Sequence, residues 1–267
     1  MKSSLVADAT SEIGRAVAKR LAQVGQRVLA CGSDEARLLE LDRRLSQSEL
    51  HRTRTSTAAA QASEWIEQQN TGLDHLVLIP PLGEIAPQNT QDAHGATTLH
   101  ELPQSFLTPA RVQATLLSRF VLECNEWVRI CLPALQRGKR PKKVLIIHEL
   151  PDTDSGLCRL IAQSCRAQTA ELARELAPQR VHVNALFAQA LESERRVQAL
   201  CTAADVAPES PEALECIKEA ARGVPLRSFV PLPDLAAHAE TLLGSFTDHV
   251  TGKAFTLDSG SSETPVG

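Results

Sequence analysis

Short apolar runs alternate along the chain with stretches in which apolar residues recur at helical spacing. The first run, at 3–7, is followed by a polar turn and an amphipathic stretch at 13–24, the pattern of a strand, a turn and a helix. The same alternation continues through most of the chain. It predicts further strands at 28–31, 76–79, 144–147 and 181–187, and helices at 35–45, 109–135 and 155–176.

This order of elements indicates the fold class. Strands separated by crossover helices pair in parallel, and right-handed crossovers place the helices on both faces of the sheet. We therefore expect an α/β fold with a doubly wound parallel sheet of about seven strands. The 267 residues contain no internal repeat and no low-complexity linker, so a single domain over 1–267 is expected. Pro, Gly, Asn, Gln and His replace periodic apolar residues at about 80–104, which predicts a long loop.

Composition narrows the classes of function. A net charge of −4 gives no overall basic character, so no nucleic-acid partner is expected. The seven cysteines form no CxxC pair. Cys124 and Cys131, like Cys158 and Cys165, recur on one helical face and are interpreted as small buried side chains, so no metal site is expected. The chain begins directly on a strand and has no apolar run of about 18 residues, so we expect a cytoplasmic protein without a membrane span.

Three segments carry a resemblance to a known family. The helix-to-strand passage at 175–185 (ELAPQRVHVNA), the stretch at 220–226 (AARGVPL) and the C-terminal segment at 250–260 (VTGKAFTLDSG) occur in the order and at about the distances found in short-chain dehydrogenases/reductases. The chain resembles this family along nearly its whole length. The resemblance implies a Rossmann-like sheet, a nicotinamide dinucleotide at its carboxyl edge and proton transfer by a tyrosine.

The positions that match the family's cofactor site depart from its pattern. The family's TGxxxGxG turn corresponds to 7–14, where Asp8 and Glu12 replace two glycines and Gly14 remains. The acidic residue that holds the ribose of NAD corresponds to Gly32, and no arginine stands beside it to suggest NADP. Two unit charges about 4 Å apart repel by about 1 kcal/mol in water and by about 4 at an effective dielectric of 20. We therefore expect the two carboxylates to exclude a dinucleotide and to satisfy the amides of the helix start instead.

The catalytic positions depart as well, and the chain contains no tyrosine at all. The family's tyrosine, lysine and serine correspond to Cys158, Ala162 and Glu149. The expectation is that the chain on its own is not an enzyme and has no catalytic residue. An alternative is a cofactor-independent enzyme or a small-ligand-binding protein that uses a remodelled cleft, in which His148, Glu149 and Cys158 lie near one another.

The resemblance also implies assembly. In the family, the fourth and fifth helices and the last strand form two-fold contacts, and here the matching helices at 109–135 and 155–176 keep apolar positions. Such an interface accepts a related chain if both keep the same surface. We expect an inactive subunit paired with an active, NAD-binding relative as an α2β2 tetramer. The complex would be an alcohol or hydroxyacyl-CoA dehydrogenase, similar to one from anaerobic toluene breakdown.

Overall fold

The computed structural model describes residues 2–32, 34–44, 48–52, 72–80, 118–138, 140–150 and 156–261. Seven strands form one sheet in the order β3-β2-β1-β4-β5-β6-β9, and every neighbouring pair is parallel. Their bounds are β1 Ser3–Val6, β2 Arg27–Gly32, β3 Ser48–Arg52, β4 His75–Leu78, β5 Lys142–Glu149, β6 Val181–Ala188 and β9 Ala254–Leu257. The expected α/β fold with a doubly wound parallel sheet is confirmed.

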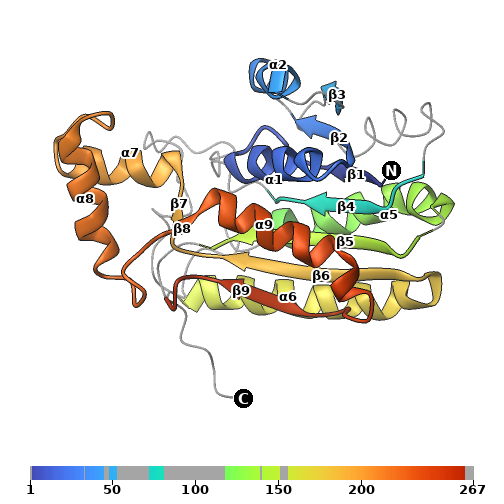
Figure 1. Ribbon diagram of the computed structural model, residues 1–267. Helices are drawn as coiled ribbons and strands as arrows, with labels where there is room; N and C mark the ends of the chain where they lie inside the picture. Colours follow the sequence, from blue (N-terminus) through green and yellow to red (C-terminus); the bar gives the residue numbers. More distant parts are fainter. Residues whose placement is uncertain are drawn as a thin grey trace, which may run out of the picture.

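Helices cover both faces of this sheet (Figure 1). The helices are α1 Glu12–Gln23, α2 Glu35–Arg44, α5 Glu123–Arg137, α6 Gly156–Leu176, α7 Glu194–Ala203, α8 Pro211–Ala221 and α9 Leu232–Leu243. A π-helix, Ser118–Leu122, precedes α5, and short 3-10 turns lie at Ala177–Gln179 and Ser245–Thr247. A small second sheet joins β7 Leu191–Glu192 to β8 Val230–Pro231.

Two apolar layers form the core because successive strand residues point to opposite faces. Leu145 and Ile147 of β5 pack with residues of α1 and α9, whereas Val144 and Ile146 pack with residues of α5 and α6. Figure 1 shows α1 and α9 side by side on one face and α7 and α8 extending away from the sheet at the end to which β4 and β6 point. That end is the carboxyl edge, where ligands bind in open sheets of this kind.

The sequence specifies the ends of several helices directly. Ser11 accepts a hydrogen bond from the backbone N–H of Gly14 and caps α1, while Ser193 and Ser210 cap α7 and α8 in the same way. The chain leaves α1 through Gly25, whose φ of 78° favours glycine. The helices expected at 35–45 and 155–176 are observed closely as α2 and α6.

Some expectations fall on residues outside the described ranges. The loop at about 80–104 lies there beyond Pro80, as does the helix expected at 109–135 before Ser118. Both stay predictions, as does the single-domain organisation. Within the described ranges, no helix combines the length and apolar character needed to cross a membrane, and no group of His, Cys, Asp and Glu is arranged to hold a metal ion.

Candidate functional site at the carboxyl edge of the sheet

The turn between β1 and α1 keeps the backbone of a glycine-rich turn, although acids replace its glycines. Asp8 has a φ of 56°, in the left-handed region that glycine adopts most easily. Gly14 approaches the turn so closely that an added Cβ would lie 2.1 Å from the carbonyl oxygen of Asp8. The path that brings a backbone close to a phosphate is therefore preserved, and one retained glycine is required for it.

The carboxyl group of Asp8 is held in a largely buried position at this turn. The Thr10 hydroxyl donates a hydrogen bond to its Oδ1 atom at 3.0 Å, and the backbone N–H of Ser11 also bonds to Asp8. Burial raises the pKa of Asp8 from 3.8 to about 6, against the opposing effects of these hydrogen bonds and of the Arg37 charge. Asp8 is thus much easier to neutralise near pH 7 than an aspartate in water.

The carboxylate of Glu12 does not face the start of its own helix. Its oxygens accept hydrogen bonds from the backbone N–H groups of Glu194, at 2.6 Å, and Arg195, at 3.3 Å, in the first turn of α7. The start of α1 is capped by Ser11 instead, through the N–H of Gly14 at 3.0 Å. The expectation that Glu12 satisfies the amides of α1 is wrong. The same expectation for Asp8 is confirmed in part, because Asp8 accepts a hydrogen bond from the backbone N–H of Ser11, the residue that caps α1.

Two arginines reach the turn from either side. Arg15 of α1 and Arg37 of α2 each donate to the carbonyl oxygen of Thr10, at 3.3 and 3.2 Å. Thr10 also covers Gly32, because a Cβ added there would lie 2.2 Å from its methyl carbon. Sequence reasoning looked for an arginine directly beside Gly32 and missed Arg37. The available signal was the position of Arg37 in the first turn of the helix that follows β2.

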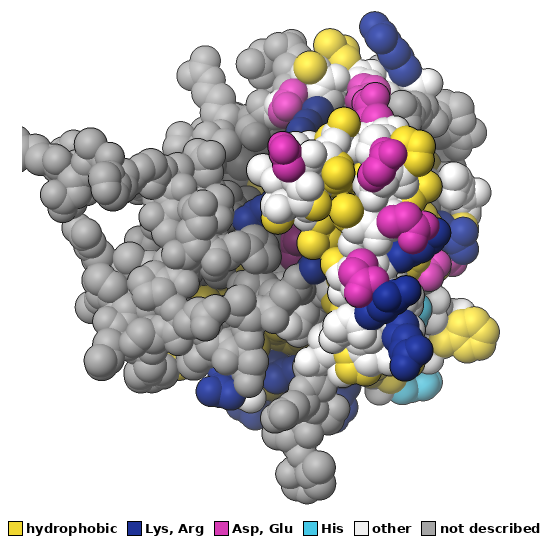
Figure 2. Space-filling model, turned by 90° about the vertical axis from the view of Figure 1, so that its left-hand side faces the viewer, with side chains coloured by type: hydrophobic (Ala, Val, Ile, Leu, Met, Phe, Trp, Pro, Cys, Tyr) yellow, Lys and Arg dark blue, Asp and Glu magenta, His cyan; other side chains and the backbone are white. Residues whose placement is uncertain are grey.

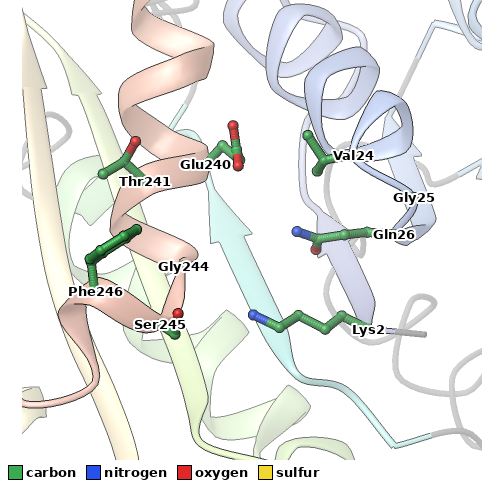
Figure 3. A pocket seen from close by; sticks show the side chains of 9 residues that line it. All are labelled: Lys2, Val24, Gly25, Gln26, Glu240, Thr241, Gly244, Ser245 and Phe246. Carbon is green, nitrogen blue, oxygen red and sulfur yellow. The ribbon is translucent and has the colours of Figure 1, made fainter.

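A groove of about 600 Å³ opens beside this turn and is lined by both arginines together with Glu12 and Glu194. Figure 2 looks onto the carboxyl edge and shows acidic and basic side chains interspersed over its described part. A second pocket, of about 410 Å³, lies at the opposite edge, where Lys2 and Gln26 face Glu240 and Ser245 (Figure 3). Since it is remote from the β1–α1 turn, it is not part of the candidate site.

The positions aligned with the family's catalytic groups lie on β5 and α6. Glu149 is the last residue of β5 and is half-buried, and Ala162 is buried in α6. Cys158 lies in the first turn of α6, and its side chain is outside the described part of the structure. Of these three positions, Glu149 carries a carboxyl group, a type of side chain used for general acid–base catalysis.

His148 has a different environment from Glu149. Its ring is fully buried between Phe187, at a centroid distance of 5.1 Å, and Phe120, at 5.9 Å. Within the described residues neither ring nitrogen has a hydrogen-bond partner, and burial lowers the pKa of His148 to about 3. Because neighbouring strand residues point to opposite faces, His148 and Glu149 do not form a pair. This geometry disfavours the part of the alternative site in which His148 and Glu149 act together, and the side chain of Cys158 lies outside the described part of the structure.

Solved structures show what the fold is similar to. L-sorbose reductase from Gluconobacter frateurii, complexed with NADPH and L-sorbose, matches with a TM-score of 0.75 at 16% identity, over 98% of this chain and 97% of that chain. An NADPH-bound short chain oxidoreductase from Pseudomonas aeruginosa PAO1 with an atypical catalytic center matches with a TM-score of 0.77 at 19% identity, over 98% and 97%.

YwfH, an NADPH-dependent reductase involved in bacilysin biosynthesis, matches with a TM-score of 0.74 at 16% identity, over 98% of this chain and 99% of that one. No family model matches the chain, and no curated protein matches its sequence. The chain therefore has the fold of short-chain reductases.

These structures contradict two expectations drawn from the sequence, namely that the chain alone is not an enzyme and that it binds no cofactor. The matching structures are reductases, and two of them hold NADPH. One does so with an atypical catalytic center, so altered catalytic groups are not evidence of inactivity. The physical error lay in treating Asp8 and Glu12 as two fixed charges at the turn, since the first is readily neutralised and the second is bound to α7.

Proposed function

We propose that the chain is an oxidoreductase that binds NADPH at the carboxyl edge of its sheet and reduces a carbonyl compound with an atypical set of catalytic groups. The observation that carries this proposal is the β1–α1 turn. It keeps the left-handed backbone at Asp8 and the close approach at Gly14, and two arginines flank it. The likeness to NADPH-bound reductases over nearly the whole chain supports it.

The electrostatics of the turn are compatible with a pyrophosphate. With a pKa of about 6, neutralising Asp8 at pH 7 costs about 1.4 kcal/mol, since each pH unit corresponds to that amount. This cost is comparable to the repulsion of about 1 to 4 kcal/mol between a charged carboxylate and a phosphate charge about 4 Å away, so protonation of Asp8 can offset that repulsion. The charge of Glu12 is stabilised by two N–H groups at the start of α7. Arg15 and Arg37 supply positive charge on the two sides.

The end of β2 favours NADPH over NADH. A carboxylate at this position would hold the ribose hydroxyls of NAD and repel the 2′-phosphate of NADP, whereas a nearby arginine accommodates that phosphate. Here the position is Gly32, and the guanidinium of Arg37 lies 3.2 Å from the carbonyl oxygen of Thr10, which packs on Gly32. Arg37 is therefore the residue that we assign to the 2′-phosphate.

Bound NADPH would supply the hydride, and the chain must supply or admit a proton for the carbonyl oxygen of the substrate. Glu149 ends β5 at the same edge of the sheet and is half-buried. We assign the proton donor to its carboxyl group. Glu149→Gln keeps the size and removes the acid, so it should lower kcat for carbonyl reduction while leaving the Kd for NADPH unchanged. Equal turnover by both proteins would remove Glu149 from the mechanism.

The discriminating experiment compares NADPH and NADH binding by calorimetry in two arginine variants. Arg37→Ala should weaken NADPH binding about tenfold or more beyond any loss of NADH binding, since the charge-assisted contact to the 2′-phosphate is worth about 1.5–3 kcal/mol and NADH lacks that phosphate. Arg129→Ala is the matched control, because Arg129 pairs with Glu126 as Arg37 pairs with Asp34, three residues before it on or next to a helix. No preference for NADPH in the wild-type protein, or the same loss in both variants, would contradict the assignment.

The assembly is a separate proposal. The last strand, β9, lies at the edge of the sheet, and Leu122, the last residue of the π-helix before α5, is 60% exposed. These features support contacts through α5, α6 and β9 with a related NAD-dependent dehydrogenase in an α2β2 tetramer, and the expected link to toluene breakdown stays a prediction. Native mass spectrometry of the chain expressed alone and together with such a relative tests it. A stable homotetramer that excludes the relative would refute it.

A further inference from the structure

Glu12 makes contacts that no glycine at its position makes. Its two carboxylate oxygens hold the N–H groups of Glu194 and Arg195, the first two residues of α7. The guanidinium of Arg15, one turn further along α1, lies 3.3 Å from the carboxylate of Glu194. Together these contacts join α1, at the β1–α1 turn, to the start of α7 across 182 positions of sequence.

Helix α7 is also held by the side chain of Arg196, which donates to the carbonyl oxygen of Leu191 and lies 4.7 Å over the ring of Phe229, and by packing against α8. Of its ten residues, Cys201 alone is buried. Leu191, in β7 just before it, pairs with Val230 of β8, and α7 and α8 extend away from the sheet (Figure 1). A helix with so little buried surface opens locally at low cost. Because so little of α7 is buried, contacts at its first turn contribute to holding it in place.

The two N–H groups need an acceptor from outside the helix. The first N–H groups of any helix lack partners within it. In α7 the side chain of Ser193 accepts the N–H of Arg196 and leaves those of Glu194 and Arg195 to Glu12. A carboxylate at this end also interacts favourably with the helix dipole. Loss of Glu12 therefore removes an acceptor for two groups and a charge at once.

We propose that Glu12 is a latch: a positioning residue that fastens α7 to the β1–α1 turn and thereby controls access of a dinucleotide to that turn. The second part of this statement rests on the proposed function, whereas the first concerns the free chain alone. The same side chain stands at the turn where the phosphates of NADPH would approach. The carboxylate of Glu12 therefore interacts both with α7 and with an approaching phosphate of the dinucleotide. As a result, the position of α7 is coupled to whether a dinucleotide is bound at the turn.

The test is amide hydrogen exchange of the free protein, followed residue by residue by NMR, in Glu12→Ala and Glu12→Gln. The latch predicts that exchange accelerates about tenfold or more along the whole of α7 in Glu12→Ala, including Arg196, whose N–H keeps its bond to Ser193. Glu12→Gln keeps one acceptor oxygen and should give a smaller acceleration. Amides of β5 and β6 report whether the core is intact.

Glu194→Gln is the matched control. It removes the ion pair with Arg15 and leaves the bond from the N–H of Glu194 to Glu12. The side chain of Glu194 is 75% exposed, so exchange along α7 should change less than about twofold, as expected for a surface ion pair. If Glu12→Ala accelerates only the amides of Glu194 and Arg195, Glu12 is a local cap and the latch is refuted.

A second measurement separates the latch from the proposed function. Stopped-flow mixing of NADPH with wild type and Glu12→Ala should show faster association in the variant, because α7 opens more readily. The chain could bind no NADPH while Glu12→Ala still accelerates exchange along α7. This result would overturn the proposed function, but the conclusion that Glu12 fastens α7 would stand. Normal NADPH binding with unchanged exchange along α7 would overturn the latch and leave the proposed function standing.

Discussion

Asp8→Asn should stabilise the protein above pH 6, an unusual result for a change at a glycine-type turn. The pKa of Asp8 is raised from 3.8 to about 6, chiefly by burial. Between these values the folded state binds a proton that the unfolded state has lost, so stability falls as pH rises through this window. The loss is complete above pH 6 and amounts to about 3 kcal/mol, the difference of 2.2 pH units at 1.36 kcal/mol each.

Asparagine keeps the features of the turn that do not depend on charge. Its amide oxygen can accept the Thr10 hydroxyl as Asp8 does, and asparagine tolerates the left-handed backbone. The assay is urea unfolding of both proteins from pH 3.5 to pH 8. The curves should lie close together near pH 3.5, where the carboxyl is protonated in the folded state and mostly protonated in the unfolded state, and separate by about 3 kcal/mol at pH 7 in favour of the variant.

Asp205→Asn is the control for this experiment. Asp205 also has a left-handed backbone, with a φ of 55°, but its side chain is exposed. Its replacement should change stability by less than about 0.5 kcal/mol at any pH, as is usual for surface positions. A constant difference between Asp8→Asn and wild type across the pH range, or a loss of stability at pH 7, would refute the argument that Asp8 is a buried, raised carboxyl.

Two further predictions concern the core near the site. His148 has a pKa lowered from 6.5 to about 3, so as pH falls through this window only the unfolded state takes up a proton and stability is lost, by up to about 5 kcal/mol. His148→Phe should remove that part of the acid sensitivity, and a variant that unfolds at the same acidic pH as wild type would contradict this. Gly14→Ala places a Cβ 2.1 Å from a backbone oxygen and should cost about 3 kcal/mol or more in urea unfolding. Gly25→Ala, at a φ of 78° with open space around it, should cost only about 1 kcal/mol, and equal costs would show that close approach at Gly14 is not needed.

The sequence predicted the fold well because the fold depends on local patterns. The apolar runs that became β1, β2, β4, β5 and β6 are short and bounded by turns, and the helices between them have clear periodicity. Crossover handedness then leaves few arrangements of the sheet. The segments that resemble short-chain dehydrogenases added the position of the last strand, β9, at the edge.

The site was predicted less well because its properties depend on contacts between distant residues. The acceptor role of Glu12 involves an amide 182 positions away, and the raised pKa of Asp8 depends on burial by the folded chain. Arg37 reaches the turn because the fold brings the start of α2 beside Thr10. Residue identity alone therefore suggested two permanent negative charges at the turn. In the fold, Asp8 has a pKa close to neutral pH, and the carboxylate of Glu12 is bound to the start of α7.

The central claim is that this chain, on its own, binds NADPH at the β1–α1 turn when Asp8 is neutral. The most direct test is a fluorescence titration of the isolated protein with NADPH at pH 6 and at pH 8. The account predicts one site with a Kd on the order of 1–100 µM at pH 6. With a pKa of about 6, the neutral fraction of Asp8 falls about fiftyfold between the two pH values, so binding should weaken by a similar factor. Absence of binding at millimolar NADPH at both pH values would contradict the account.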